Sequence, residues 1–120
     1  MKLEELRVYQ KAMDIADDIW RVVLLWDSFS KETVGKQLIR AIDSVAANVS
    51  EGYGRYHFKE AKHFYYYSRG SLFETKTWLN KALNRSLITN EKFKELILEL
   101  DSLGIKLNNF INSIGQIKKQ

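Results

Sequence analysis

Apolar residues recur at steps of three and four in four segments of the chain, a spacing that places them on one face of an α-helix. Stripes of this kind cross residues 3–26, 31–52 and 57–84. The clearest stripe, within residues 90–117, consists of Leu96, Leu100, Leu103, Leu107, Phe110, Ile114 and Ile117. The pattern therefore predicts four helices over these ranges, and no segment is a strand candidate of comparable quality.

The four predicted helices have similar lengths and short connections, which makes consecutive helices antiparallel neighbours. We therefore predict one domain over residues 1–120, an all-α, antiparallel up-down-up-down four-helix bundle. The alternative is a pair of long hairpins that complete their core only on dimerisation. Ser30 and Thr89 are the predicted N-caps of the second and fourth helices. Gly52 or Gly54 is predicted to end the second helix in a left-handed cap.

The composition suits long helices and excludes several classes of protein. The 120 residues include no proline, which would interrupt helical hydrogen bonding, and no cysteine, which excludes disulfides and thiolate chemistry. No apolar run approaches the ~18 residues of a membrane-spanning helix. The first residues also lack the apolar core of a signal peptide. We therefore expect a cytoplasmic protein with no membrane partner.

The third predicted helix carries an unusual second face, opposite its core stripe. Steps of three and four bring together Lys62, Tyr66, Arg69, Phe73, Lys76 and Asn80. Aromatic residues and arginine are typical of subunit interfaces, and we favour an oligomer contact through Tyr66, Arg69 and Phe73. Lysines beside tyrosines are also typical of surfaces that bind single-stranded nucleic acid, so this alternative stays open.

Charge is unevenly distributed along a chain whose net charge is +4. Residues 62–90 contain five basic residues and one acidic residue, a net charge of +4. The residues that we predict to contact nucleic acid are Lys59, Lys62, Arg69, Lys76, Lys81 and Arg85. The first helix carries Asp14, Asp17 and Asp18, which the third helix of a neighbouring copy could meet.

The second and third helices also suggest a structural ion pair. If they pair antiparallel about a turn near residue 55, Arg40 lies level with Ser71 and within one turn of Glu74. The small residues Gly70 and Ser71 would let the arginine side chain lie between the helices. We therefore predict an Arg40–Glu74 ion pair that sets the helix register.

Catalytic and metal-binding patterns are incomplete. Residues 60–63 match the Glu-x-x-His spacing of di-iron bundles, but that site needs two such motifs and two further glutamates. Gly52 and Gly54 follow a helix rather than a strand, and no Lys-Ser pair follows them, so we do not predict a phosphate-binding loop here. We predict no enzymatic activity, no metal and no cofactor.

Two segments carry a resemblance to a known family: residues 37–55 and residues 70–75. They match the pattern Q-L-x-R-A, N-I-A-E-G-x-G-R and G-S-x-x-E-T through Gln37, Arg40, Asn48, Glu51, Gly52, Gly54, Arg55, Gly70, Ser71 and Glu74. On these residues the chain resembles the four-helix-bundle proteins encoded in intervening sequences of bacterial 23S rRNA genes, the "S23 ribosomal protein" family. It departs at Ser30 and Ala46, where relatives often carry proline, and at Ser86, within a turn that reads Leu-Gly-Tyr in relatives.

The resemblance implies a ring-shaped homopentamer in which the motif residues are structural and none is catalytic. More distantly, the chain is similar to the accessory variability proteins of diversity-generating retroelements, which bind nucleic acid and a reverse transcriptase. The expected partners are therefore further copies of the chain, and RNA or an RNA-associated protein. We predict a non-enzymatic homo-oligomeric module that binds structured RNA through its basic surface. The alternative is a scaffold that assembles itself or docks another protein without binding nucleic acid.

Overall fold

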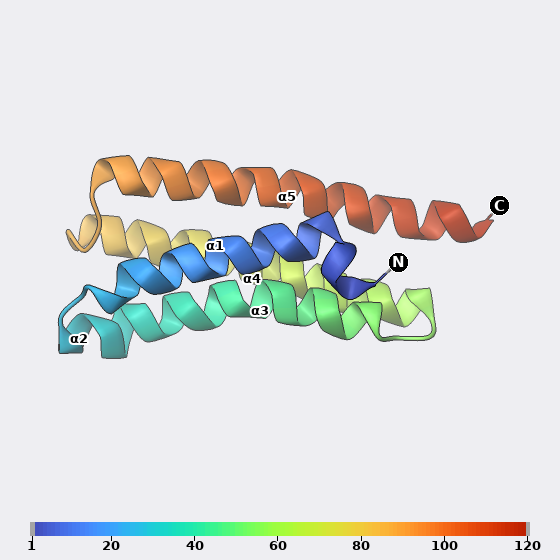
Figure 1. The fold of residues 1–120 in the computed structure, drawn as a ribbon, viewed down its shortest axis with the longest axis horizontal. Coiled ribbons are helices and arrows are strands. Elements are labelled where there is room, and N and C mark those ends of the chain that lie inside the picture. The colour runs from blue at the N-terminus through green and yellow to red at the C-terminus, as the bar shows by residue number, and fades with distance from the viewer. Residues whose placement is uncertain (1, 120) are drawn as a thin grey trace.

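The computed structural model describes the backbone of residues 2–119 and the side chains as far as Ile114. Within this range every regular element is helical (Figure 1), which confirms the predicted all-α class. The four long helices are α1 (Arg7–Leu24), α3 (Lys36–Tyr53), α4 (Phe58–Asn84) and α5 (Asn90–Lys119). A short 3₁₀ turn, η1 (Leu3–Glu5), precedes α1.

The helices form a bundle in which each long helix reverses the direction of the one before it (Figure 1). α1 packs against α3 and α5, and α4 packs against the same two helices. The bundle is long and narrow, with extents of 51 × 23 × 21 Å. One chain buries a continuous hydrophobic core, which disagrees with the two-hairpin alternative.

The second predicted helix begins earlier than the sequence suggests, so the predicted Ser30 cap is wrong. Asp27 is the N-cap: its carboxylate accepts a hydrogen bond from the Ser30 amide at 3.0 Å and another from the Ser30 hydroxyl at 2.8 Å. These bonds lower the pKa of Asp27. The helix then runs from α2 (Ser28–Ser30) through a π-helical segment, η2 (Lys31–Gly35), into α3. A carboxylate cap three residues upstream leaves Ser30 inside the helix.

The predicted cap at Thr89 is confirmed, because its hydroxyl accepts a hydrogen bond from the Lys92 amide at 3.1 Å. The predicted left-handed cap at Gly52 or Gly54 is wrong. Gly52 lies within α3, and Gly54 ends the helix with φ −78°, a right-handed conformation. Glycine is needed at position 52 instead because the close contact between α3 and α4 leaves no space for a side chain.

The left-handed residue in the described part of the chain is Ser86, with φ 61°. It follows α4 in a Schellman turn, in which the Leu87 amide donates to the Ala82 carbonyl at 2.8 Å and the Ser86 amide donates to the Leu83 carbonyl at 3.0 Å. Glycine is the usual residue at this position of the turn. Ser86 thus occupies a glycine position at the α4–α5 turn.

The core contains most of the predicted α5 stripe. Its fully buried side chains from α5 are Leu96, Leu100, Leu103, Leu107 and Ile111. Phe110 is only partly buried and packs edge-on against the buried Tyr65 ring, with the ring centroids 4.9 Å apart. Ile117 lies outside the described side chains.

α3 and α4 approach each other closely at two points. A Cβ added to Gly52 would lie 2.6 Å from Cε1 of Tyr65 and 2.9 Å from the carbonyl oxygen of Ala61. Farther along, the buried Ser68 hydroxyl donates to the Val45 carbonyl at 2.7 Å. Small side chains therefore set the distance between these helices.

None of the helices in the described range is long and apolar enough to cross a membrane.

Candidate functional site

The outward face predicted for the third helix lies beside α5 and is partly engaged within the chain. Arg69 donates to the Asn108 side chain at 3.0 Å, and Lys76 pairs with Asp101 at 2.6 Å. Arg69 also lies over the Tyr66 ring, 4.9 Å from its centroid. Arg69 and Lys76 of this face therefore contact α5 of their own chain.

Large apolar side chains remain exposed between these polar contacts. Tyr66 and Phe73 of α4 are 44% and 61% exposed, and Leu98 and Ile105 of α5 are 69% and 64% exposed. The spacing of Leu98, Asp101 and Ile105 places all three on one side of α5. We call this surface the α4–α5 edge, defined by Tyr66, Arg69, Phe73, Lys76, Leu98, Asp101, Ile105 and Asn108.

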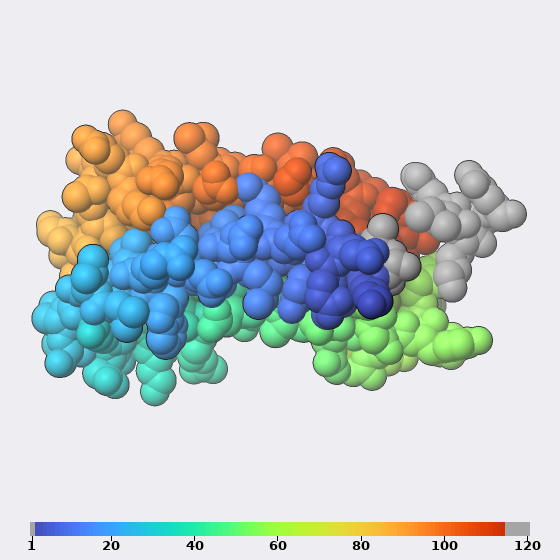
Figure 2. All heavy atoms as spheres, viewed as in Figure 1, coloured from blue at the N-terminus to red at the C-terminus, as the bar shows by residue number. Residues whose placement is uncertain are grey.

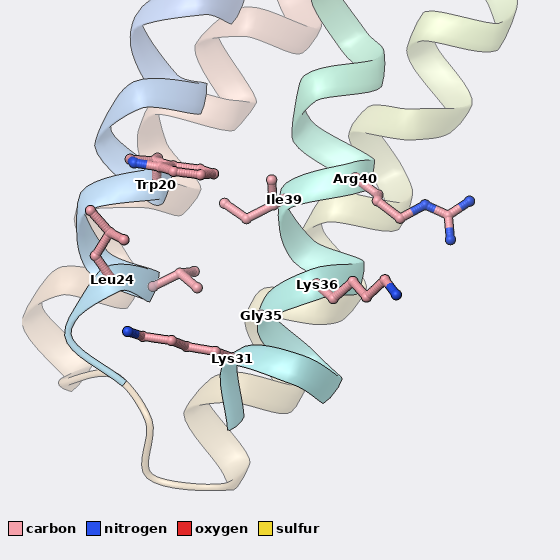
Figure 3. Close-up of a pocket in the computed structure, with 8 residues that line it drawn as sticks. Trp20, Leu24, Lys31, Gly35, Lys36, Ile39 and Arg40 are labelled. Carbon is pink, nitrogen blue, oxygen red and sulfur yellow. The ribbon is translucent and has the colours of Figure 1, made fainter. Parts of the chain in front are cut away.

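A second apolar surface is a groove between α1 and the η2–α3 segment (Figure 3). Its volume is about 290 Å³ at the α2 end. Trp20 and Ile39 point into the gap from opposite sides, whereas Lys36 and Arg40 extend from the outer side of α3. The residues lining this end are Trp20, Val23, Leu24, Lys31, Gly35, Lys36, Ile39 and Arg40.

A separate hollow of about 310 Å³ lies between α1 and α3, closer to the start of α1. Figure 2 shows this side of the molecule, where the surface steps inward over the middle of α3. Small residues of α3 make up one wall, and the lining residues are Tyr9, Met13, Ala16, Asp43, Ala46, Ala47 and Ser50. The sequence predicted that the first and second helices are neighbours, but it did not indicate a groove between them.

The acidic residues of α1 are only partly available to a partner. Asp18 pairs with Lys92 of α5 at 3.0 Å. Asp43 of α3 has a raised pKa, first because burial disfavours its charge and second because of the negative charge of Asp17. Asp17 and Asp18 therefore act on neighbouring helices of their own chain.

The predicted Arg40–Glu74 ion pair is wrong. Glu74 accepts a hydrogen bond from Nε1 of Trp78 at 3.1 Å, while Arg40 lines the α1–α3 groove. The register argument placed the two residues at similar positions along the bundle, but the ion pairs of the described residues include none between Arg40 and Glu74. Gly70 is exposed, with nothing within 4 Å of an added Cβ, so it makes no passage for an arginine.

The family-motif residues at the α3–α4 turn form a cluster of polar contacts. Arg55 pairs with Glu51 at 2.7 Å and with Glu60 at 3.0 Å, and its guanidinium lies 4.6 Å from the centroid of the Phe64 ring. The Asn48 amide donates to the Ser44 carbonyl at 2.9 Å. This arrangement ties the end of α3 to the start of α4.

A third hollow, of about 420 Å³, lies between η2 and the C-terminal half of α4. We call it the Trp78 hollow; it is lined by Glu32, Thr33, Val34, Gln37, Trp78, Lys81 and Arg85. Lys81 lies 5.8 Å from the centroid of the Trp78 ring. An adjacent hollow of about 450 Å³ shares Thr33, Val34 and Arg85 and adds Phe29, Ser30 and Leu87.

The six predicted nucleic-acid contacts do not form one surface. Arg69 and Lys76 reach α5, whereas Lys81 and Arg85 line the Trp78 hollow. Lys59 and Lys62 lie at the start of α4 (Phe58–Asn84), and the described residues include no ion-pair partner for either. Within the described residues, no group of three or more His, Cys, Asp or Glu side chains could hold a metal ion.

Comparison with known proteins identifies relatives but no activity. The family model described as "23S rRNA-intervening sequence protein" matches residues 4–109. A crystal structure of a protein with unknown function from the S23 ribosomal protein family of Bacteroides thetaiotaomicron is similar, with a TM-score of 0.81 and 21% identity. The match covers 88% of this chain and 95% of that chain, and at this identity it shows the fold alone. No curated protein matches the chain.

Proposed function

The chain belongs to the family of 23S rRNA-intervening sequence proteins, and on this premise we propose that it is a non-enzymatic module that assembles into a homo-oligomer in the cytoplasm. A ring of five copies is the favoured form, on the resemblance alone. Neither the family description nor that of the solved structure names an enzymatic activity.

The observation that carries this proposal is the exposure of large apolar side chains on two separate surfaces. Phe73, Leu98 and Ile105 are 61–69% exposed on the α4–α5 edge. Trp20 and Leu24 are 52% and 50% exposed along the α1–α3 groove. Contiguous apolar surface of this kind is typical of interaction sites. Because the two surfaces differ, a contact between them is heterologous and closes into a ring or continues as a filament.

Charge supports docking of the edge into the groove. Lys31, Lys36 and Arg40 line the groove, and the described chain contains no ion pair for any of them. On α5, Glu91 and Glu95 are exposed on the same side as Leu98, and Glu95 also pairs with Lys92 of its own helix at 3.4 Å. An apolar ridge flanked by carboxylates therefore complements an apolar groove flanked by cations.

Light scattering on the purified protein tests assembly, and two variants test the contact. Ile105→Lys places a cation against the cationic groove, and Trp20→Ser removes the largest exposed ring of the groove. Each variant alone should be monomeric, while an equimolar mixture should form a two-chain species. In the mixture, the groove of the Ile105→Lys variant and the edge of the Trp20→Ser variant are both intact, so one contact between the two chains can still form.

Tyr56→Ser is the matched control, because Tyr56 is 90% exposed at the α3–α4 turn and belongs to neither surface. Its mass should equal that of the wild type. A wild-type mass near that of one chain at micromolar concentration would overturn the proposal. Variants that break assembly but fail to complement each other would instead show a symmetric contact and overturn the edge-to-groove assignment.

RNA binding is a second proposed function, favoured by the two cations beside an aromatic ring in the Trp78 hollow. The alternative is assembly without nucleic acid. Purification of the native protein with and without nuclease separates them: bound RNA raises the absorbance at the nucleic-acid maximum only in the untreated sample. Equal absorbance in both samples contradicts RNA binding.

A further inference from the structure

The Trp78 ring is held in a fixed position at the surface. Its inner part packs against the core, and its Nε1–H donates to Glu74 at 3.1 Å. The remaining ring surface lines the hollow. Lys81 approaches this ring at 5.8 Å, near the outer limit of a cation–π contact, so a stacked group could displace it at little cost. The ring is therefore a preorganised stacking platform.

Two cations beside this platform lack carboxylate partners. Lys81 and Arg85 form no ion pair within the described part of the chain, and the Glu74 carboxylate faces the indole instead. Arg85 is the C-cap of α4, and the Schellman turn that follows fixes its backbone. A guanidinium and an ammonium that converge on one opening suit a phosphate group.

Arg85 also borders the adjacent hollow, in which the Phe29 ring is 77% exposed. A phosphate at Arg85 would therefore have an aromatic ring on either side, Trp78 in one hollow and Phe29 in the other. Gln37 lines the Trp78 hollow, and its amide makes no side-chain hydrogen bond to the described residues. A free amide can both donate to and accept from a base edge.

From this arrangement we infer that the two hollows hold a dinucleotide step of single-stranded RNA. One base stacks on Trp78 near the Gln37 amide, the linking phosphate binds Arg85 and Lys81, and the next base enters the hollow beside Phe29. Glu74 is a positioning residue, because it touches the indole rather than the RNA. The inference rests on the proposed RNA binding and names the surface responsible for it.

The remaining charged residue of the hollow predicts a gain of affinity. Glu32 of η2 lines the same hollow, across from Lys81 and Arg85 at the end of α4. Its negative charge opposes a phosphate held there, so Glu32→Gln should tighten binding. A purely structural surface would show no such gain, which makes this variant a sensitive readout of ligand charge.

The test is the fluorescence anisotropy of a labelled single-stranded uridine RNA of about 12 nucleotides, titrated with the full chain at low salt. Trp78→Leu, which keeps an apolar side chain but removes the stacking face, should weaken binding roughly ten-fold or more. Arg85→Gln should weaken binding and reduce its salt dependence. Lys94→Gln is the matched control, since it removes one cation from an exposed part of α5 outside both hollows.

Two further arms separate related explanations. Glu74→Gln keeps an acceptor for the indole and should bind as the wild type, whereas Glu74→Met should weaken binding; thermal unfolding confirms that both variants fold. Adenosine monophosphate should compete far less well than the RNA strand, because it fills only one hollow. Equal competition would overturn the dinucleotide assignment in favour of a free-nucleotide pocket.

The outcomes distinguish the proposed RNA binding from the assignment of that binding to the Trp78 hollow. If the wild type fails to bind the RNA probe at low salt, RNA binding itself is overturned. If the wild type binds but Trp78→Leu and Arg85→Gln behave as Lys94→Gln does, RNA binding stands and this site is wrong.

Discussion

Two helix interfaces of the bundle, α3 against α4 and α5 against its neighbours, are packed in different ways. α3 meets α4 through small residues at Gly52 and Ser68, where backbone and side-chain atoms of the two helices come into direct contact. α5 meets its neighbours through a stripe of buried leucines, with charged pairs such as Lys76–Asp101 and Lys11–Glu99 along its margins. Small residues let α3 and α4 approach closely, whereas large leucine side chains fill the interface between α5 and its neighbours.

This difference determines where each interface is sensitive. Close contact leaves no space for an added atom, so one methyl group at Gly52 must displace the Tyr65 ring or the α4 backbone. The α4–α5 interface has more tolerance: a Cβ at Gly104 would meet only Cδ2 of Leu72, at 3.2 Å. The marginal ion pairs are partly exposed, and such pairs contribute little to stability.

The largest expected effect is at Gly52. Gly52→Ala should lower the free energy of unfolding by about 1–3 kcal/mol, because it overpacks the α3–α4 contact. Gly70→Ala is the matched control, since an added Cβ there meets nothing and alanine favours the helix by up to about 1 kcal/mol. Urea unfolding followed by circular dichroism measures both. Equal effects at the two glycines would contradict the close-contact interpretation.

The next effect is at Ser68. Ser68→Ala removes the 2.7 Å hydrogen bond to the Val45 carbonyl and should destabilise by about 1 kcal/mol. Thr75→Ala is a useful comparison, because the Thr75 hydroxyl bonds to Ser71 within its own helix. If Ser68→Ala left the urea midpoint unchanged, the hydrogen bond between α3 and α4 would make no contribution to the stability of the protein.

At the α4–α5 turn we expect a gain. Ser86→Gly should raise the free energy of unfolding by about 0.5–1 kcal/mol, because glycine adopts φ 61° without the steric penalty of a side chain. Ser102→Gly, on the right-handed backbone of α5, should instead destabilise by about 0.5 kcal/mol. Opposite signs in thermal unfolding support the assignment; a loss at both positions contradicts it.

The smallest effect is at the margin of α5. A double-mutant cycle of Lys76→Met and Asp101→Asn should give a coupling energy of about 0.2–1 kcal/mol that decreases with added salt. For comparison, Arg40→Met and Glu74→Gln should be additive, because the structure contains no ion pair between these two residues. Strong coupling between Arg40 and Glu74 would reinstate the ion pair that the structure lacks.

Most of the fold could be predicted because helical periodicity is local. The four stripes gave the helix ranges to within a few residues, and the Thr89 cap depends only on the next three residues. The Asp27 cap was missed since Asp27 and Ser30 both suit an N-cap, and the sequence does not rank them. The exposed rings of Tyr66 and Phe73 were predicted because they lie opposite the core stripe.

By itself, the sequence determined the helices, their antiparallel order and the faces that α3, α4 and α5 bury, because these properties follow from residue spacing along one helix. The apolar spacing of the first helix was misleading, since Met13 and Trp20 are 41% and 52% exposed while Val8, Ala12, Ile15 and Ile19 are buried. Only the tertiary structure decided which side chains from different helices meet. Arg40 and Glu74 lie at similar positions along the bundle, yet Glu74 bonds to Trp78 of its own helix. Trp78 and Gln37 line one hollow that neither segment indicates alone. Contacts between helices depend on rotation and distance as well as level, and these are set only when the whole core packs.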